Sequence, residues 1–255
     1  MHTRWKVTNH QADFVILGET PDLLAVDKPA GLLVHPTKPG GPPTLWDAAR
    51  DLLRYEIANG GQVSIVNRLD RETSGVVLIA KSSNAAREAG LTMQQGGIRK
   101  TYAAIVWGHV AEDCFVVNEP IIRLGEVGPS AIYLQRAVHP LGAKSRTEFR
   151  VLKRFFRGEG AFTLLEARPI TGRTHQIRVH LAHVGHAVVG DKIYGPDPQC
   201  YLEFIRTGWT PSLADRLLLC EHALHSTSLA LTWRGDPLAF HSGLPVRMQG
   251  FLDRD

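Results

Sequence analysis

The sequence has little cysteine and no long apolar run. Its 255 residues include three cysteines, Cys114, Cys200 and Cys220. This odd, scattered set does not form the framework of a disulfide-stabilised secreted domain, so we expect a reducing, cytoplasmic compartment. No apolar stretch approaches the roughly 18 residues that a membrane-spanning helix needs. The first 17 residues also lack the continuous apolar core of a secretory signal. We therefore predict no membrane partner.

Internal repeats, low-complexity tracts and common metal-binding motifs are also missing. The sequence contains no CxxC and no HExxH pattern. Histidines crowd residues 175–186, but Gly185 is expected to end the local helix before His186. We therefore predict no metal site; a site built on these histidines is the alternative. Hydrophobic residues make up 44% and charged residues 21% of the chain, which is typical of a folded globular protein and excludes intrinsic disorder.

Charge is concentrated in one part of the chain. Residues 136–178 contain ten Lys and Arg side chains against three acidic ones, a net charge of +7, while the rest of the chain has a net charge of −3. A local basic segment in a nearly neutral protein favours a polyanionic partner. The alternative is an ordinary solvated surface. The ten basic residues are Arg136, Lys144, Arg146, Arg150, Lys153, Arg154, Arg157, Arg168, Arg173 and Arg178.

Hydrophobic periodicity predicts a mixture of strands and helices without regular alternation. This mixture favours the α+β class over a doubly wound α/β fold. Strands are expected at 14–17, 23–27, 63–66, 76–80, 102–107 and 224–233, with a hairpin formed by 147–155 and 162–168. Helices are expected to begin after four caps, which are Thr44 with Asp47, Ser82 or Ser83, Thr174, and Ser212 with Asp215.

The loop at residues 67–75 is the first candidate site. It lies between two apolar strands and places Asp70 between Arg68 and Arg71. Neighbouring cations favour the ionised carboxylate, and a positioned carboxylate serves as a nucleophile or a base. A structural turn with surface ion pairs is the alternative.

Two further groups of residues are candidates for binding or catalysis. Arg173 precedes an expected helix start, where anions bind, and its guanidinium can contact a phosphate or a carboxylate through two nitrogens. A capped, solvent-facing basic helix is the alternative. Tyr102 opens an apolar strand directly after Lys100 and Thr101, and its ring can stack on a base. An ordinary core tyrosine is the alternative there.

These motifs together resemble the RluA-type pseudouridine synthases. The run RLDRETSG at 68–75 looks like the RLDxxTSG signature of that family, and GRTHQIRVH at 172–180 looks like its third motif. KPAGLLVHP at 28–36 is similar to the KPxG segment, and Lys100-Thr101-Tyr102 to the K-x-Y element. The resemblance extends from about residue 14 to residue 246.

The resemblance implies an RNA isomerase that converts uridine to pseudouridine without a cofactor or metal. It also implies an α+β fold with a central mixed, largely antiparallel sheet, flanking helices and a basic active-site cleft. Asp70 matches the essential nucleophile, Arg173 the arginine that pairs with it, and Tyr102 the tyrosine that stacks on the uracil and is a candidate base. Arg68 matches a residue that holds RNA with its target base flipped out, and Ile177 one that packs on the base. The remaining candidates for RNA contact are basic residues in or beside these motifs and in the basic segment: Arg71, Lys100, Lys153, Arg154 and Arg178.

The chain departs from the family pattern in two respects. Asn67 occupies the position before Arg68, where the family usually has His. Residues 1–13 are too short for the RNA-binding module found in many relatives, so we expect a tail at 1–13 and one catalytic domain at 14–255.

The predicted partner is structured RNA, either ribosomal or transfer RNA, and not DNA; a monomer is the default state. The C1′–N1 bond must break and C5 must bond to C1′, which requires the base to leave the stack. Asp70 attacks C1′, attacks C6, or assists loss of the 2′ proton. The rival functions are a catalytically inactive RNA-binding protein of the same fold and a glycosidase, which needs a second carboxylate.

Overall fold

The chain divides into two compact units. The computed structural model describes residues 5–9, 12–38 and 40–253, and the side chains from residue 14 onward within these ranges. The first unit comprises residues up to 100 and Ser226–Gly243, and the second comprises Thr101–His225 and the residues from Leu244. The chain leaves the first unit within one strand and returns to it within another. The expectation of a single catalytic domain from residue 14 stays a prediction.

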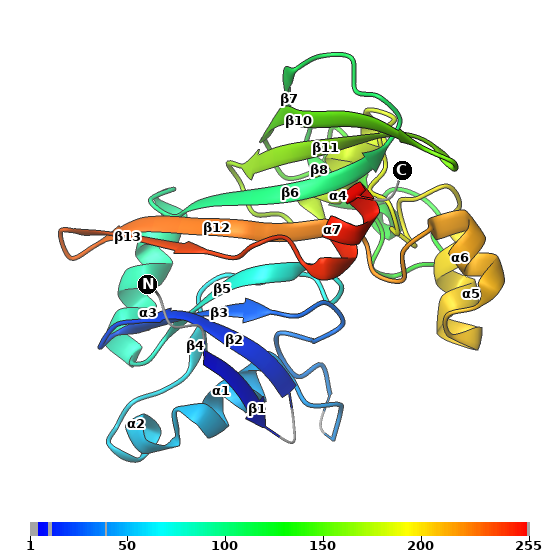
Figure 1. Ribbon diagram of the computed structural model, residues 1–255. Helices are drawn as coiled ribbons and strands as arrows, with labels where there is room; N and C mark the ends of the chain where they lie inside the picture. Colours follow the sequence, from blue (N-terminus) through cyan, green and yellow to red (C-terminus); the bar gives the residue numbers. More distant parts are fainter. Residues whose placement is uncertain (1–4, 10–11, 39, 254–255) are drawn as a thin grey trace. The chain divides into compact units, whose positions relative to one another are not determined.

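The first unit is built on a sheet in which β3 lies between β2 and β5 (Figure 1). The strand order is β1-β2-β3-β5-β12, with β13 paired to β12 and β4 paired to β5. All pairs with a described register are antiparallel. The strands are β1 (Trp5–Asn9), β2 (Ala12–Glu19), β3 (Leu23–Lys28), β4 (Ser64–Ile65), β5 (Ser74–Ala80), β12 (Leu224–Trp233) and β13 (Asp236–His241).

Helices of the first unit begin where the sequence predicts. Helix α1 (Leu45–Leu52) has the predicted capping box of Thr44 and Asp47, and α3 (Ser83–Gln94) is capped by Ser82. Helix α1 ends at Leu52, the chain turns at Leu53, and a second short helix, α2 (Arg54–Ala58), follows. Alternating residues of β3 and β5 form a core with Ala85 and Ala89 of α3, so α3 covers one face of the sheet.

The second unit has an antiparallel sheet in the order β6-β11-β10-β7. The predicted hairpin is confirmed as β10 (Thr147–Arg157) and β11 (Gly160–Pro169), beside β6 (Arg99–Trp107) and β7 (Cys114–Val117). Buried Phe162 of β11 contacts the ring of Phe251 edge-on at 5.1 Å between ring centroids. This contact packs α7 (Val246–Asp253) on the sheet.

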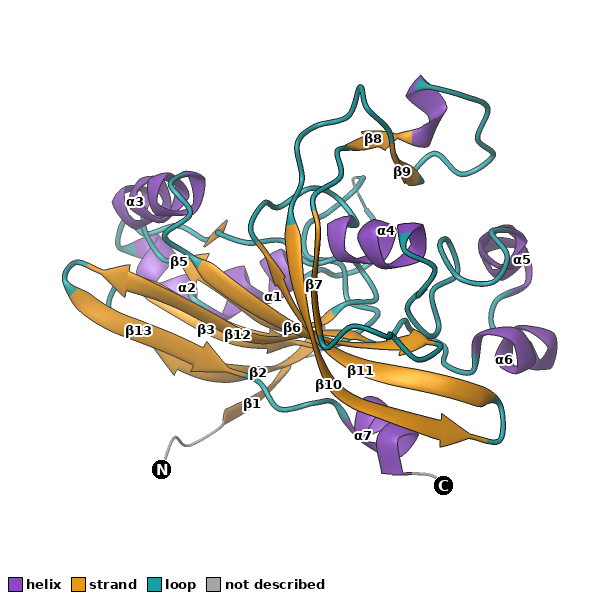
Figure 2. Cartoon of the chain, turned by 90° about the horizontal axis from the view of Figure 1, so that it is seen from above, coloured by secondary structure: helices purple, strands orange, loops and turns teal. Residues whose placement is uncertain are grey.

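A small two-stranded sheet, formed by β8 (Ile121–Arg123) and β9 (Arg136–Val138), stands beside helix α4 (Gln176–His183) (Figure 2). The 3₁₀ turn η1 (Leu124–Glu126) follows β8. Helices α5 (Gln199–Thr207) and α6 (Pro211–Leu217) lie side by side around a small buried cluster that includes Cys200.

Two predicted caps are wrong. Helix α4 follows His175, not Thr174, and α6 is capped by Thr210, two residues before the predicted Ser212. Pro211 explains the second difference, because proline suits the first turn of a helix, where its missing N–H costs nothing. The α+β class is confirmed. No helix in the described part of the chain is both long and apolar enough to cross a membrane.

Candidate active site

The loop that carries Asp70 is held in place by the KPAG segment. Lys28 is fully buried, and its ammonium group donates hydrogen bonds to the carbonyls of Pro29 at 2.8 Å, Leu32 at 2.9 Å and Arg71 at 3.1 Å. A buried cation is stable only when its donors are satisfied. Lys28 therefore fastens the end of β3 to the loop beside Asp70.

Gly31 and Arg71 bind each other reciprocally. The Gly31 N–H donates to the Arg71 carbonyl at 2.9 Å, and the Arg71 Nε donates to the Gly31 carbonyl at 3.1 Å. Gly31 has φ of 84°, in the left-handed region that favours glycine. The exposed Arg71 was predicted to contact RNA; its Nε instead braces the loop, and its remaining donors stay candidates for that contact.

Asn67, which stands where the family usually has His, is held by hydrogen bonds to β5. This buried amide donates to the Val76 carbonyl at 3.1 Å and accepts from the Leu78 N–H at 2.8 Å. One side chain thus completes two backbone hydrogen bonds of β5. The other end of the loop is equally constrained, because a Cβ on Gly75 would stand 2.2 Å from the Ser226 carbonyl oxygen.

Asp70 itself is half-buried, and its carbonyl accepts the Thr73 N–H at 3.2 Å, which closes a tight turn. Arg68 is exposed two residues earlier. The pKa of His35 lies below its ordinary value because of burial and, second, the positive charge of Arg68. The loop therefore presents a carboxylate and a guanidinium on a rigid backbone.

The candidate base-contact residues are largely buried. Tyr102 on β6 is 8% exposed and Ile177 on α4 is 6% exposed, so each offers only an edge to a ligand. Lys100 belongs to the first unit, and burial lowers its pKa. The structure places Asp70 in the first unit and Tyr102, Ile177 and Arg173 in the second.

Arg173 is exposed on a loop whose backbone is fixed by Gln176. Its N–H donates to the Gln176 Oε1 at 3.0 Å, and its Nε donates to the Lys144 carbonyl at 3.2 Å. His175 then adopts the left-handed conformation with φ of 59°, which is uncommon for a residue other than glycine. The Tyr194 hydroxyl lies 2.7 Å from its Nδ1. This turn, and not a threonine cap, starts α4.

Arg178 was predicted to contact RNA, and its position argues against that role. It is 4% exposed and donates through Nε and Nη2 to the buried Asp191 carboxylate at 2.6 and 2.8 Å. Burial alone would raise the pKa of Asp191, but the charge and hydrogen bonds of Arg178 hold it far below its ordinary value. Arg178 therefore fixes α4 to the loop that follows it, and RNA contact is proposed for other residues.

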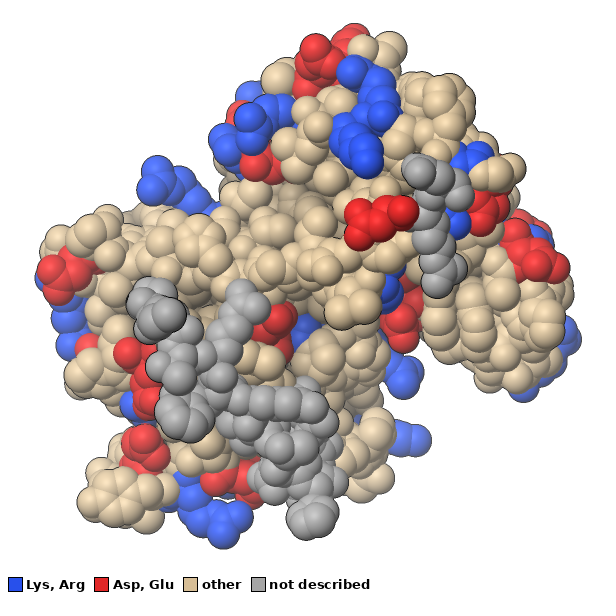
Figure 3. Space-filling model, in the orientation of Figure 1, with Lys and Arg blue, Asp and Glu red and all other residues tan. Residues whose placement is uncertain are grey.

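The basic segment divides into paired and unpaired cations. Six of its ten basic residues form ion pairs within the second unit, and on the face drawn in Figure 3 basic and acidic side chains lie interleaved. The paired residues are Arg146, Arg150, Arg154, Arg157, Arg168 and Arg178. Four have no ion pair among the described residues, and these are Arg136, Lys144, Lys153 and Arg173.

Two predicted RNA contacts on β10 differ in the same way. Arg154 donates to the Val110 and Ala111 carbonyls and to Asp113, so its guanidinium is occupied. Lys153 is exposed, with its ammonium group 5.6 Å from the centre of the Phe155 ring. Lys153 therefore remains a candidate for RNA contact, whereas the interactions of Arg154 disfavour it.

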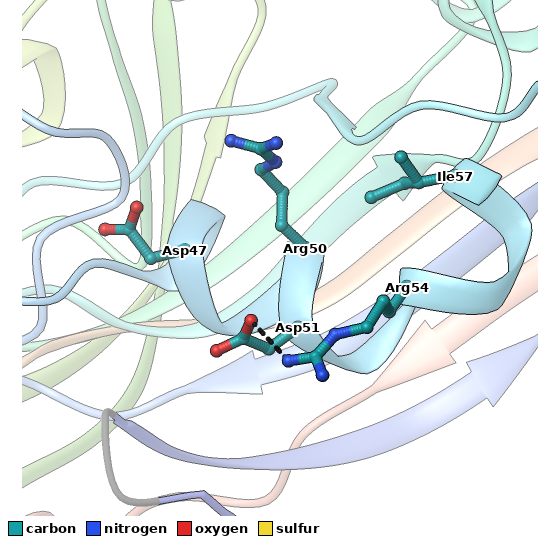
Figure 4. Close-up of a pocket in the computed structure, with 5 residues that line it drawn as sticks. All are labelled: Asp47, Arg50, Asp51, Arg54 and Ile57. Carbon is teal, nitrogen blue, oxygen red and sulfur yellow. Dashed lines mark hydrogen bonds and ion pairs between the residues drawn. The ribbon is translucent and has the colours of Figure 1, made fainter.

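A surface hollow on α1 and α2 has a balanced charge. It has a volume of about 320 Å³ and is lined by residues of alternating charge, two of which pair with each other (Figure 4). Its lining residues are Asp47, Arg50, Asp51, Arg54 and Ile57. Within the described residues, no three His, Cys, Asp or Glu side chains gather as a metal ion would require.

Comparison with known proteins decides the family. Residues 22–183 match the model of the RNA pseudouridylate synthase family. The chain belongs to this family. It is 38% identical over 253 residues to the ribosomal large subunit pseudouridine synthase D of Nitrosomonas europaea, covering 96% of this chain and 67% of that protein. Against the protein of the same name from Yersinia pestis it is 34% identical, covering 96% of this chain and 71% of the relative.

A solved structure shows the same fold. Human RNA Pseudouridylate Synthase Domain Containing 4 has a TM-score of 0.72 and 23% identity, covering 93% of this chain and 91% of that one. The resemblance inferred from the four motifs is therefore confirmed, and so is the enzyme class of an isomerase that acts on RNA. The inactive binding protein is not favoured.

Proposed function

We propose that this pseudouridine synthase modifies uridines of large-subunit ribosomal RNA, with Asp70 as its nucleophile. The curated relatives named above support the choice of RNA, since both are ribosomal large subunit pseudouridine synthases. The observation that supports the choice of Asp70 is the bracing of its loop by Lys28, Arg71 and Asn67. A nucleophile must be held in a productive geometry before the substrate arrives.

The reaction makes three demands on the side chains. The C1′–N1 bond must break, the freed uracil must turn, and C5 must bond to C1′ and release its hydrogen. The carboxylate of Asp70 acts at the ribose or at the base. Arg173, which makes no ion pair among the described residues, is the arginine that the family resemblance assigns to keep that carboxylate ionised during the reaction. Tyr102 and Ile177 offer apolar edges on which the uracil rests while it turns.

RNA enters with its target uridine flipped out of the stack, because the reacting atoms are hidden in a helix. Arg68 is exposed beside the catalytic loop and is suited to hold the opened strand. Arg71, Lys100 and Lys153 are further candidate contacts to the backbone. No step in this scheme requires a metal or a cofactor.

Mapping of pseudouridine in cells with and without the gene tests the substrate. We expect one or a few uridines of large-subunit ribosomal RNA to lose the modification on deletion and to regain it when the wild-type gene returns. Transfer RNA from the same cells is the internal control. Loss confined to transfer RNA would contradict the ribosomal assignment and leave the isomerase class intact.

A further inference from the structure

A second hollow lies in the second unit, beside β8, β9 and the loop before α4. It has a volume of about 320 Å³. Its charged lining consists of Arg123, Arg136, Arg173 and Glu126, of which Arg123 and Glu126 pair at 3.1 Å. Three guanidinium groups against one already paired carboxylate make the hollow electropositive.

Arg136 is the residue of this group that most needs a ligand. Its Nη1 is shielded from solvent and has no hydrogen-bond partner among the described residues. Its guanidinium has no ion pair there either, unlike most arginines of the basic segment. Buried donors in native proteins are nearly always satisfied, and an orphan commonly marks the place of an absent ion or ligand. A guanidinium facing a hollow fits an anion with several acceptor oxygens.

The geometry of the hollow is fixed before any ligand binds. The Tyr194 hydroxyl accepts the Arg136 backbone N–H at 2.9 Å and also contacts His175, two residues after Arg173. Tyr194 thereby ties the strand that carries Arg136 to the loop that carries Arg173. The Tyr194 backbone N–H in turn donates to Asp191, so Tyr194 is held in place by the residue that forms the buried ion pair with Arg178.

The opposite wall is equally well anchored. Ile121 and Ala143 exchange backbone hydrogen bonds at 3.0 and 2.9 Å, and a Cβ on Gly142 would stand 2.6 Å from the Ile121 backbone. The carbonyl of Lys144 then holds the Arg173 Nε. The arginines thus project from a braced frame, which lowers the ordering cost of binding.

An aromatic side chain lies against Arg123, one of the lining residues of the hollow. Tyr133 is 75% exposed, and the Arg123 guanidinium lies 4.7 Å from the centre of its ring. An exposed aromatic ring next to a guanidinium group is typical of surfaces that bind nucleic acid, where bases stack and phosphates pair. A site for a free inorganic anion needs no such ring.

We propose that this hollow binds a phosphate of the RNA backbone and that Arg136 is its principal ligand. The inference rests on the proposed function for the identity of the RNA. It assigns Arg136 and Arg123 to substrate binding.

The test measures the affinity of the full chain for a transcript of large-subunit ribosomal RNA over a range of NaCl concentrations. Arg136→Gln is expected to weaken binding by about tenfold, the scale of losing one charged hydrogen bond. It should also reduce the slope of log K against log salt by about 0.7 to 0.9, the value for one phosphate contact. Arg123→Gln should change the slope in the same direction.

Arg206→Gln is the matched control. Arg206 is an exposed arginine of the same unit, on α5, and does not line the hollow. Its substitution removes the same charge and should leave the slope unchanged. Thermal unfolding establishes that each variant is folded, and Arg123→Gln provides the test if Arg136→Gln is not. Equal slopes for wild type, Arg136→Gln and Arg123→Gln would overturn the proposal.

Titration with inorganic phosphate at constant ionic strength separates the two sources of phosphate. An RNA site should leave inorganic phosphate a weak competitor. Tight phosphate binding that is lost in Arg136→Gln while the RNA slope stays constant would overturn the assignment to RNA. These outcomes are independent of catalysis: absence of pseudouridine formation by the wild type would reject the proposed function, whereas the slope would still report on the hollow.

Discussion

The β10–β11 hairpin and the hollow beside β8 and β9 both carry arginines of the basic segment, and these arginines differ in pairing. On the hairpin, Arg150, Arg154 and Arg157 each contact a carboxylate of the same unit. Around the hollow, Arg136 and Arg173 have no ion pair among the described residues. Exposed ion pairs contribute little to stability, but they reduce the charge available to a polyanion. The net charge counted along a sequence therefore overstates how much positive surface is available to bind RNA.

The largest expected effect comes from removing the carboxylate partner of Arg178, the most deeply buried of the paired arginines. Asp191→Asn removes the carboxylate charge that the buried Arg178 guanidinium contacts, which should lower the free energy of unfolding by about 3 to 5 kcal/mol. Denaturant unfolding measures the loss. Glu148→Gln, which removes the partner of exposed Arg146, should cost less than about 1 kcal/mol. Equal losses for the two variants would show that burial does not distinguish these pairs.

An unpaired arginine should behave in the opposite way. Arg173→Ala is expected to cost at least about 2 kcal/mol of transition-state stabilisation, roughly thirtyfold in kcat/KM, because a charged hydrogen-bond partner is lost. Its unfolding midpoint should barely change, since the side chain is exposed. Release of tritium from C5 of labelled uridine measures the rate. Wild-type activity in this variant would remove Arg173 from the proposed mechanism.

The hairpin itself should contribute little to RNA binding. Simultaneous replacement of Lys153, Arg154 and Arg157 by Ser removes three positive charges, of which two already contact protein carboxylates. We expect the salt slope to fall by no more than about one phosphate contact, 0.7 to 0.9. Filter binding over a salt series provides the measurement. A fall near three contacts would show that RNA displaces the acidic partners, and the comparison would then fail.

The smallest expected effect on stability concerns His180, whose ring contacts both the β10–β11 hairpin and the segment before β8. Its Nδ1 lies 2.9 Å from Thr147 Oγ1 at the start of β10, and its Nε2 lies 3.0 Å from the Glu119 carbonyl, shortly before β8. Burial is the main reason that its pKa lies below the ordinary 6.5. The folded state therefore binds fewer protons than the unfolded state as pH falls below about 6.5, and stability decreases.

Unfolding measured from neutral to acidic pH tests this sign. The decrease should be smaller in His180→Asn, which cannot take up the proton. An identical pH dependence in the two proteins would assign the acid sensitivity to another group.

The sequence predicts the catalytic loop better than it predicts the surface. RLDRETSG and the KPAG segment are contiguous motifs whose backbone contacts are short in range, and the structure shows them braced as one unit. The strand at 224–233 was predicted to the residue, because Leu229, Leu231 and Trp233 alternate on one buried face and a turn at Gly235 follows. Pairing of Arg154 with Asp113, by contrast, joins residues 41 positions apart and leaves no local pattern.

The roles of Asp191, Tyr194 and Arg136 were missed for the same reason. Gly190 and Gly195 flank the segment that contains the first two, and each glycine is tightly packed against backbone, with a Cβ at Gly195 only 2.1 Å from the Asp191 carbonyl oxygen. That spacing of glycines around an acid and a tyrosine was an available signal. The sequence around Arg136 gave no such signal, because its lack of an ion pair among the described residues depends on the fold around it.

Substitution of Asp70 by Asn tests the central claim most directly. The amide has nearly the shape of the carboxylate but is not a nucleophile, so tritium release from C5-labelled RNA should stop while folding and RNA affinity persist. Glu72→Gln, which removes a carboxylate two residues away in the same loop, is the matched control and should retain activity. Turnover of Asp70→Asn above a few per cent of wild type, or its equal loss in Glu72→Gln, would contradict the assignment of Asp70 as the nucleophile.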